Sequence, residues 1–520
     1  MQLHIDNSFI DELPADAVTD NHVRQVFEAA FSYVNPKVPK QPKLLHVSPE
    51  MIEAVGLNLE YANSKQFLEV FSGTSVYQNT KPYAMAYAGH QFGSWAGQLG
   101  DGRAINLFEV LHNQQRWALQ LKGAGKTPYS RQGDGLAVLR SSIREYLCSE
   151  AMYHLGVPTT RALCLIETGD DVLRDMLYDG NANYEKGAIV CRLAPSFIRF
   201  GNFEFFAARQ DYKNLKKLTD YTINHFYPHL GSPSKESYKK FFEEVKQRTL
   251  KMIIDWQRVG FVHGVMNTDN MSILGLTIDY GPCGWLEGFE YNWTPNTTDA
   301  ENKRYRYGNQ PNIALWNLLQ LANALYPLVE ATKPFENILN QYKIDFEVDY
   351  LNMMRSKIGL VQQLETDADL ITRLEALLLK YETDMTIFFR KLCHYQKGMT
   401  TEGFDLISEA FYNVEGLPET LKMAWLNWFG DYNHRLQMET ANDTQRSEAM
   451  KRVNPKYVLR NYMAQLAIDA ANVGNYELID ELFQLLKKPY QEQPENEKWF
   501  AKRPEWARHK VGCSMLSCSS

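Results

Sequence analysis

The chain has 520 residues, of which 44% are hydrophobic and 22% are charged, and its formal net charge at pH 7 is −7. This length allows more than one hydrophobic core, and the composition is that of an ordinary globular protein. The negative charge gives no reason to expect nucleic acid as the main partner, although a few placed Arg and Lys side chains can still bind phosphates.

Residues 1–14 include acidic side chains and no apolar run long enough for a signal peptide. No segment reaches the roughly 20 apolar residues that cross a bilayer. We therefore expect a cytoplasmic, monomeric protein with no membrane partner. Seven scattered cysteines form no C-x-x-C pair, which argues against structural zinc. Cys513 and Cys518 lie in a polar tail, and the simpler interpretation is exposed, unpaired thiols; the alternative is a redox-responsive end that tethers the tail to the core.

Residues 1–80 combine short helical patterns with Pro-rich connections, and we assign them to an N-terminal extension. From Tyr83 the pattern changes to short strands, with residues 83–89 followed by a glycine-dense loop over 93–103. Residues 104–110 and 116–121 indicate two strands of an antiparallel hairpin around the polar stretch 112–115.

A second glycine-rich loop over 123–135 precedes residues 136–155, whose apolar residues recur at helical spacing. Strands are predicted again at 161–167 and 188–193. After Phe200 the chain is predicted to be almost entirely helical, with long helices over 238–259 and 312–328. We therefore expect an α+β, bilobal fold: a β-rich lobe over 81–200, a helical lobe over 201–490 and a tail over 491–520.

The stretch from Phe261 to Asn270, followed by Ile278-Asp279-Tyr280-Gly281, has the layout of a phosphoryl-transfer catalytic loop and the metal-binding Asp after it. Asn270 and Asp279 offer hard oxygen ligands suited to Mg²⁺ or Mn²⁺. In the kinase pattern H-R-D-x-x-x-x-N, however, Val265 stands where the base Asp belongs. Asp269 is the only carboxylate left in the loop to act as general base. His263 is interpreted as a structural loop residue, and Tyr280 as a core residue.

Lys122 ends a predicted strand, and Glu145 lies in the middle of the next predicted helix. A Lys at that position can point its ammonium at nucleotide phosphates, and the Glu can hold it in place, as in kinases. Taken singly, the two residues fit a surface Lys and a solvated helix Glu better than a nucleotide site. The glycine loop before them and Asn270 and Asp279 after them favour the nucleotide site.

The loop with Gly100, Gly102 and Arg103 allows backbone to approach phosphate closely and adds a positive charge. Most such G-x-G sequences are ordinary turns, and this alternative stays open. Asp134-Gly135 has the same two interpretations, a turn with a helix cap or a pair placed close to a nucleotide.

Arg192 and Arg199 flank the predicted change from strands to helices. Two cations at a lobe junction suit a polyphosphate, because the guanidinium fork pairs bidentately with it. A pair of salt bridges between the lobes is the alternative.

The chain contains several long, gap-free strings of distinctive sequence: Leu121–Arg131, Gly133–Gly135, Val138–Ser142, His263–Ser272 and Ile278–Pro282. These strings closely resemble the selenoprotein O family, known in bacteria as YdiU. The resemblance covers most of the chain, is densest over residues 83–328, and includes the Cys-Ser-Ser ending.

The resemblance implies a protein-kinase-like fold that binds ATP in a flipped orientation and transfers AMP, or UMP from UTP in bacterial relatives, to protein hydroxyls. It implies Asp269 as the proton acceptor, Asn270 and Asp279 as metal ligands and Glu145 as the partner of Lys122. The nucleotide contacts that it implies are Gly100, Gly102, Arg103, Lys122, Asp134, Gly135, Arg192 and Arg199. Relatives can pair the terminal thiol with a Cys in the segment after Asp-Tyr-Gly; here residues 292–296 contain none, which leaves Cys283 as a weak candidate.

The leading hypothesis is a metal-dependent enzyme that transfers AMP to Ser, Thr or Tyr of proteins. A second hypothesis is a kinase that uses Asp269 as its base. A third is a pseudoenzyme that binds nucleotide and acts as a docking module.

Overall fold

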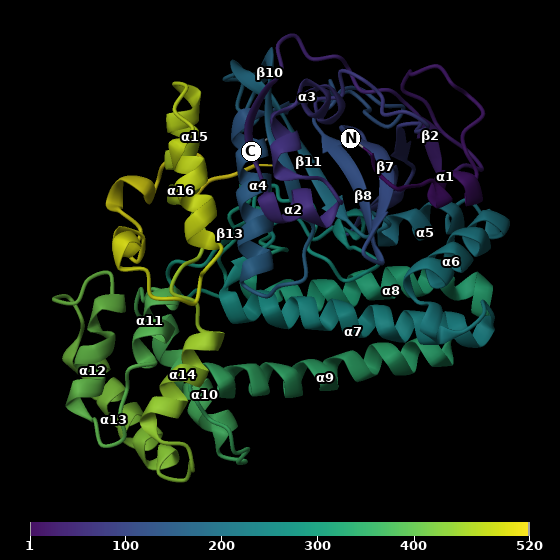
Figure 1. Ribbon diagram of the computed structural model, residues 1–520. Helices are drawn as coiled ribbons and strands as arrows, with labels where there is room; N and C mark the ends of the chain where they lie inside the picture. The colour runs from purple at the N-terminus through teal and green to yellow at the C-terminus, as the bar shows by residue number, and fades with distance from the viewer. Residues whose placement is uncertain (1, 518–520) are drawn as a thin grey trace.

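The computed structural model describes residues 2–517, and its first half is dominated by one sheet (Figure 1). Within these residues the sheet has nine strands, the pairings are antiparallel, and the order along it is β2-β4-β7-β8-β11-β10-β3, with β1 beside β7 and β9 beside β11. The strands are β1 (Ile5–Asp6), β2 (Phe31–Tyr33), β3 (Lys43–Val47), β4 (Tyr83–Met85), β7 (Ala104–His112), β8 (Gln115–Lys122), β9 (Ala137–Val138), β10 (Arg161–Arg174) and β11 (Asn183–Ala194).

The predicted hairpin is confirmed as β7 and β8, which are joined by a tight turn. Asn113 and Gln114 both have positive φ, 48° and 63°, as the turn of a two-residue hairpin requires. The predicted strands at 161–167 and 188–193 are also confirmed, and as β10 and β11 they extend further than expected into a long two-stranded ribbon.

Two parts of the sheet region differ from the prediction. Residues 93–103, expected as a loop, include β6 (Ser94–Gln98), which pairs with β5 (Ala88–Gln91) in a separate hairpin. Phe92 and Gly93 turn the chain with φ of 51° and 86°, so the glycines here serve a turn between strands. The first 80 residues supply β1, β2 and β3 besides the short helices α1 (Ser8–Glu12), α2 (Pro49–Ala54) and α3 (Lys65–Phe71). These strands are too short to show alternation, and their pairing with later strands determines them.

The helix predicted over 136–155 is α4 (Leu139–His154). It begins later than expected because Ala137 and Val138 pair with β11 as β9. One side of α4 packs on β10 and β11, and the other packs on α15 (Asn461–Asn472) and α16 (Glu477–Leu486), so the helix is buried almost all round (Figure 1).

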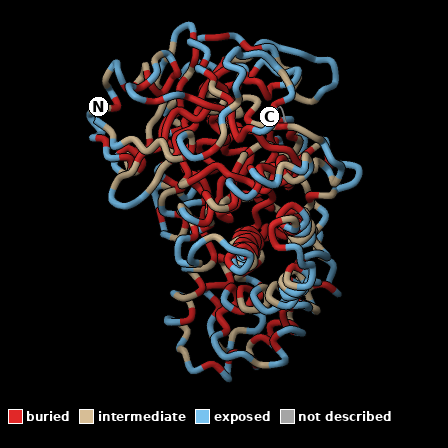
Figure 2. The backbone as a smooth tube through the Cα atoms, turned by 90° about the vertical axis from the view of Figure 1, so that its right-hand side faces the viewer, coloured by how far each residue is buried: buried red, intermediate tan, exposed pale blue. Residues whose placement is uncertain are grey.

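The second half is helical, as predicted. The expected helices over 238–259 and 312–328 are α7 (Lys235–Val259) and α8 (Gln310–Val329), which lie with α9 (Lys333–Lys357) in a layer below the sheet (Figure 1). Two hydrophobic cores run through the described chain, one beneath the sheet and one among the later helices (Figure 2). The other helices are α5 (Phe200–Ala207), α6 (Tyr212–Phe226), α10 (Asp367–Lys380), α11 (Met385–Leu392), α12 (Thr401–Ile407), α13 (Glu419–Leu436) and α14 (Asp443–Val453).

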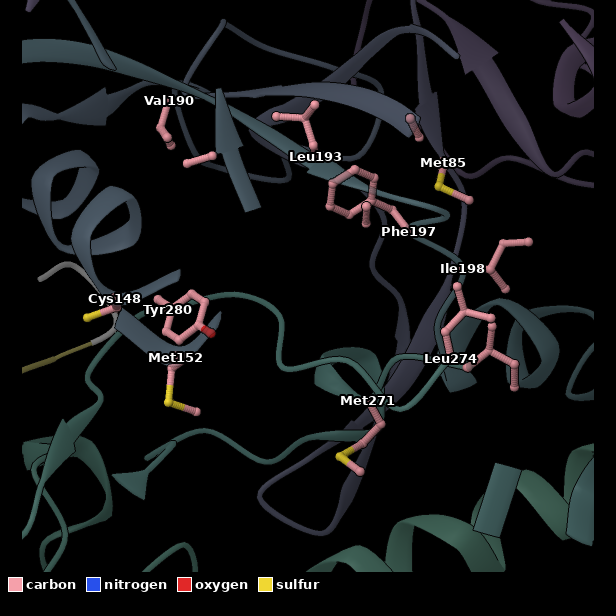
Figure 3. Close-up of a cluster of buried hydrophobic side chains, with 14 of the residues drawn as sticks. Met85, Cys148, Met152, Val190, Leu193, Phe197, Ile198, Met271, Leu274 and Tyr280 are labelled. Atoms are coloured by element: carbon pink, nitrogen blue, oxygen red, sulfur yellow. The ribbon is translucent and has the colours of Figure 1, made fainter. Parts of the chain in front are cut away.

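The loop that follows α7 is fixed at both ends by a short strand pair, β12 (Phe261–Val262) with β13 (Gly284–Trp285). Gly264 adopts φ of 77°, and a Cβ there would lie 2.1 Å from the carbonyl oxygen of Pro282, so the loop closes tightly on itself. Tyr280 is 1% exposed and packs near Cys148 and Met152 of α4, which confirms it as a core residue (Figure 3).

The tail is packed against the rest of the protein. The Cys513 side chain is 3% exposed, so the expectation of an exposed thiol is wrong for this residue. The Asn461 amide donates to the Cys513 carbonyl oxygen (2.8 Å), and the Leu516 N–H donates to the Pro295 carbonyl oxygen (3.0 Å). Cys518 lies outside the described residues. The Cys283 sulfur lies 3.9 Å from that of Cys148. Within residues 2–517, no helix has the length and apolar character needed to cross a membrane.

Gly123, directly after Lys122, provides a test of how tightly this fold is built. It adopts φ of 96°, and a Cβ there would lie 2.5 Å from the Cβ of Ala137 and 2.8 Å from the carbonyl oxygen of Ala188. We expect Gly123→Ala to lower the free energy of unfolding by about 2 kcal/mol or more, because backbone strain and overlap add.

The measurement is the shift of Tm by scanning calorimetry. Gly474→Ala is the matched control, since Gly474 has a similar φ of 88° with no atom within 4 Å of the added Cβ. It should lower Tm clearly less. Equal shifts for the two variants would contradict the tight packing at Gly123.

Candidate active site

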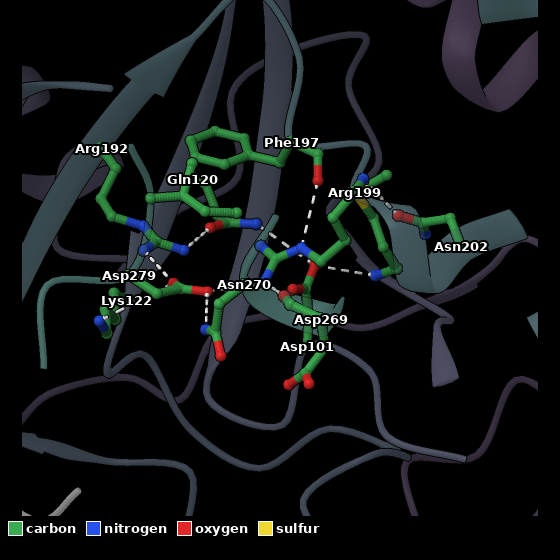
Figure 4. A network of polar contacts seen from close by, with 12 residues as sticks. Asp101, Gln120, Lys122, Arg192, Phe197, Arg199, Asn202, Asp269, Asn270 and Asp279 are labelled. Atoms are coloured by element: carbon green, nitrogen blue, oxygen red, sulfur yellow. Dashed lines mark hydrogen bonds and ion pairs between the residues drawn. The ribbon is translucent and has the colours of Figure 1, made fainter. Parts of the chain in front are cut away.

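Asp279 is at the centre of a buried network of charges (Figure 4). Its backbone adopts φ of 61°, unusual for a residue with a side chain. Arg192 Nη1 donates to one carboxylate oxygen (2.6 Å), and Arg199 Nη1 donates to the other (2.7 Å). The Asn270 amide donates to Asp279 Oδ2 (3.2 Å), and Lys122 Nζ lies 4.0 Å from Oδ1.

The sheet and the helical half each supply one of the two arginines. Arg192 lies on β11, directly opposite Gln120 of β8, whose side-chain oxygen accepts a hydrogen bond from Arg192 Nη2. Because side chains two apart on a strand share a face, Gln120 and Lys122 point to the same side of the sheet. Arg199 precedes α5 as its N-cap residue. Both arginines are 2% exposed.

Lys122 and Glu145 form an ion pair between β8 and α4. Glu145 is 1% exposed, and its other oxygen accepts from Arg192 Nη1 (2.9 Å). Burial opposes its ionisation, but the charges of Lys122 and Arg192 outweigh burial and hold the pKa of Glu145 below its ordinary value. The interpretation of a surface Lys and a solvated Glu is therefore wrong for this pair.

Burial and neighbouring positive charges also oppose each other at Asp279. Burial alone would raise its pKa, but Arg199, Arg192 and Lys122 together hold the pKa of this carboxyl well below its usual range. Arg192 and Arg199 are thus engaged in salt bridges with Asp279, and salt bridges are the alternative role that the sequence left open for them. Ion pairing of this kind keeps the guanidinium groups ordered and facing the site.

Asp269 has a different environment. It is 8% exposed, its Oδ1 atom has no hydrogen-bond partner within the described residues, and its Oδ2 accepts only from the Gln91 amide (3.3 Å). Arg199 donates to the Asp269 backbone carbonyl (2.9 Å) and not to its carboxylate. Burial raises the pKa of Asp269 to about 7, and the charge of Arg199 offsets only part of the effect. A carboxyl group with this pKa is suited to accept a proton near neutral pH.

Two neighbouring residues of the loop complete the site. Asn270 Oδ1 is buried with no hydrogen-bond partner among residues 2–517. His263 is 1% exposed, and its Nε2 lies 2.8 Å from the Ile278 carbonyl oxygen. Burial lowers the pKa of His263, which favours the neutral ring and supports its structural interpretation. Val265 carries no group that could accept a proton.

The loop with Gly100 and Gly102 packs closely on Tyr129. Gly100 has φ of 109°, and a Cβ there would lie 2.4 Å from the Tyr129 ring. Between the glycines, Asp101 is 2% exposed and accepts from the Gln120 amide (3.2 Å), which links this loop to Arg192 through Gln120. Arg103 lies beside the end of β8, where its carbonyl oxygen accepts from the Gly123 N–H (2.7 Å).

Asp134 and Gly135 are not joined to the network by any contact in the described chain. Both Asp134 oxygens accept from Arg174 (2.7 Å each), and Oδ1 also accepts from the Leu136 N–H (2.9 Å). Asp134 is exposed, and its contacts are those of the turn interpretation. Gly135 has φ of 74°, and a Cβ there would lie 2.1 Å from the Gly125 carbonyl oxygen.

Glu50, Glu150 and His154 form a separate group with the spacing of metal ligands. Arg161 donates to Glu150 (2.7 Å) and to Glu50 (3.1 Å). A guanidinium at this position already balances the two carboxylates.

Sequence reasoning missed three residues that contact the site. Gln120 carried a usable signal, because it lies two residues before Lys122 on one strand. Asp101 stands inside the singled-out glycine loop, but nothing in the sequence indicates its burial. Gln91 comes from the β5–β6 hairpin, which was not predicted, and only the tertiary structure brings it to Asp269.

Comparison with known proteins places the chain among relatives along its whole length. The family model described as protein adenylyltransferase SelO matches residues 17–487. The protein nucleotidyltransferase YdiU of Flavobacterium johnsoniae is 61% identical over 519 residues, covering 100% of this chain and 99% of the relative. The proteins of the same name from Rhodopirellula baltica and Aromatoleum aromaticum are each 52% identical, again covering 100% of this chain and 99% of the relative. The chain therefore belongs to the SelO family, and these YdiU proteins are its relatives.

Proposed function

We propose that the protein transfers AMP, or UMP, from a nucleoside triphosphate to Ser, Thr or Tyr hydroxyls of protein substrates and releases pyrophosphate. One observation carries this proposal: the buried Arg192 and Arg199 and the partly buried Lys122 surround Asp279, beside a buried carboxylate oxygen of Asp269 that has no partner in the described chain. The names of the family and of its relatives support nucleotidyl transfer.

We further propose that the sheet and the helical half correspond to the lobes of a protein-kinase-like fold, with the boundaries stated for the sequence. The ion pair between Lys122 and Glu145 and the order of Asn270 and Asp279 support this correspondence. Val265 at the kinase base position supports a nucleotide bound in the reverse orientation, with its α-phosphate near Asp269.

In the proposed reaction the acceptor hydroxyl oxygen attacks the α-phosphorus while Asp269 takes the hydroxyl proton. The bond between the α-phosphorus and the bridging oxygen breaks, and pyrophosphate leaves with the electron pair. Lys122, Arg192 and Arg199 exchange part of their contact with Asp279 for the phosphate oxygens. Positioning and fixed charges supply most of the rate enhancement in such transfers. Gly100, Gly102, Arg103, Asp134 and Gly135 remain proposed nucleotide contacts.

The residues around Asp279 fit a divalent cation. Asn270 Oδ1 is an unpartnered, buried oxygen in the described chain, and Asp279 stays ionised under the influence of its cations. Asn270 and Asp279 would hold Mg²⁺ or Mn²⁺, which prefer oxygen ligands together with substrate phosphates. When bound, such an ion neutralises charge on the phosphate oxygens.

Labelled ATP separates nucleotidyl transfer from the alternatives. We expect label from the α-phosphate to stay on an acceptor protein and label from the γ-phosphate to leave with pyrophosphate. Asp279→Asn is the control and should abolish incorporation. Incorporation from the γ position alone would support the kinase hypothesis, and the absence of either label with both metals would support the pseudoenzyme hypothesis.

A second prediction concerns the proposed base. Asp269→Asn should lower kcat by about 10²–10⁴, the usual contribution of a general base, while the Kd for ATP changes little. The matched control is Asp255→Asn, because Asp255 is also 8% exposed but pairs with Lys251 and Arg258 on α7. A kcat loss of the same size in both variants would remove Asp269 from the proposed reaction.

The pKa of Asp269 also predicts how stability depends on pH in the ligand-free protein with chelator present. Its pKa is raised from 3.8 in the unfolded chain to about 7 on folding, so ionised Asp269 destabilises the fold as pH rises through this range. Replacement by Asn removes a cost of up to about 4 kcal/mol at pH 8. The gain in Tm of Asp269→Asn should therefore grow from pH 5 to pH 8.

Asp279→Asn should lower Tm, whereas Asp269→Asn should raise it. The pKa of Asp279 lies below this window, so the loss of its ion pairs should lower Tm by a similar amount at pH 5 and pH 8. A constant Tm difference for Asp269→Asn would show that its carboxyl does not titrate as described.

A further inference from the structure

The β5–β6 hairpin, residues 88–98, lies over the catalytic loop and reaches from the proposed base to the surface. The His90 N–H donates to Thr268 Oγ1 (2.8 Å), and the Phe92 N–H donates to Asn267 Oδ1 (3.1 Å). Between these two contacts, the Gln91 amide donates to Asp269 Oδ2 (3.3 Å). Phe92, at the tip of the hairpin, therefore directly follows Gln91, the residue that contacts Asp269.

Two large apolar side chains at this tip are open to solvent. Phe92 is 39% exposed and Trp95 is 46% exposed, although both lie beside buried parts of the site. The Phe92 ring contacts the Tyr305 ring with centroids 5.3 Å apart, and Trp95 contacts His90 with centroids 5.0 Å apart. Exposed aromatic residues held in place from behind are typical of interfaces.

A cation lies against the same tip. Arg304 packs on the hairpin, because a Cβ on Gly93 would lie 3.2 Å from its guanidinium carbon. It also lies over the Trp316 ring, 4.8 Å from the centroid, and Trp316 contacts His90 with centroids 5.3 Å apart. Lys303 is exposed next to it. We define the tip patch as Phe92, Trp95, Arg304 and the adjacent residue Lys303.

The two cations of the patch have no carboxylate in direct contact within the described residues. Across residues 2–517, neither Lys303 nor Arg304 forms an ion pair with a carboxylate, whereas Arg192 and Arg199 within the site do. Two acids precede these cations in the same segment. Glu301 is exposed and forms no ion pair within residues 2–517, and Asp299 uses its oxygens to accept the backbone N–H groups of Arg304 (2.9 Å) and Tyr305 (2.7 Å). A partner that carries negative charge would complement this surface.

We propose that the tip patch binds the acceptor protein through an extended acidic segment that carries an apolar residue near the modified hydroxyl. This inference rests on the proposed function and names its acceptor class. An extended chain advances about 3.3 Å per residue, so a hydroxyl at Asp269 has its close neighbours in sequence at the hairpin tip. The apolar neighbour packs on Phe92 and Trp95, and the acidic neighbour faces Lys303 and Arg304.

The experiment uses the full chain and a short fluorescein-labelled peptide in which a serine is flanked by glutamate and phenylalanine. A second peptide has lysine in place of glutamate. Binding is followed by fluorescence anisotropy without nucleotide, and AMP incorporation is followed as a function of peptide concentration at saturating ATP. The variants are Trp95→Ala and Arg304→Glu.

Each variant should weaken binding of the acidic peptide about tenfold and raise its KM about tenfold, with the Kd for ATP unchanged. Arg304→Glu should also shift preference toward the lysine peptide. Trp506→Ala and Arg452→Glu are matched controls: Trp506 is 47% exposed on the tail segment, and Arg452 is an exposed cation on α14 with no ion pair in the described chain. These two control variants should change neither the binding nor the KM of the acidic peptide.

Equal effects of tip variants and controls, or equal binding of the two peptides by the unmodified protein, would overturn the proposal. The binding measurement separates this outcome from failure of the proposed function. If selective binding is lost in the tip variants while no AMP is ever incorporated, the result supports the tip patch as the binding surface and contradicts the proposed reaction.

Discussion

The constraint on which the site depends is the pairing of the partly buried Asp279 with the buried Arg192 and Arg199. Each of these charges would be costly to bury alone, and removing one partner from such a group costs about 3–5 kcal/mol because the others are left unpaired. Arg192 comes from the sheet, Arg199 from the start of α5, and Asp279 from a loop after α7. The network therefore joins the two halves of the protein at the point where the candidate site lies.

Two carboxylates ten positions apart in the sequence, Asp269 and Asp279, have opposite properties for this reason. Asp279 receives both guanidinium groups and stays ionised. Within the described residues, the one side chain that donates to the carboxylate of Asp269 is the Gln91 amide, so burial dominates and raises the pKa of Asp269 to about 7. Environments that separate the pKa values of two nearby carboxyl groups give them different roles. In the proposed reaction, Asp279 provides fixed charge and Asp269 moves a proton.

The position of Glu145 depends on parts of the chain that are distant in sequence. Its helix, α4, is enclosed between the sheet and the pair α15 and α16. Arg144, the residue before Glu145, donates to the side-chain oxygen of Asn461 (3.3 Å) and to the backbone carbonyl oxygen of Gly512. The tail thus contributes to the packing that holds α4, and through Glu145 it supports Lys122.

The sequence alone determined the local elements and the chemistry of the loops. The β7–β8 hairpin, α4, α7 and α8 were predictable because their hydrophobic periods and turn residues are local signals. Lys122, Arg192, Arg199, Asn270 and Asp279 could be named from motif order and from the family resemblance, and the structure brings them together in one network.

Other features were decided only by the tertiary structure. The strands of the first 80 residues exist through pairing with strands far along the chain, and Gln91 meets Asp269 through a hairpin whose glycines resemble a loop. The burial of Cys513 and the separation of Asp134 from the charge network likewise arise from long-range packing. Hydrophobic period and turn chemistry act between neighbours in sequence, whereas desolvation, charge pairing and strand register depend on groups that only the folded chain brings into contact.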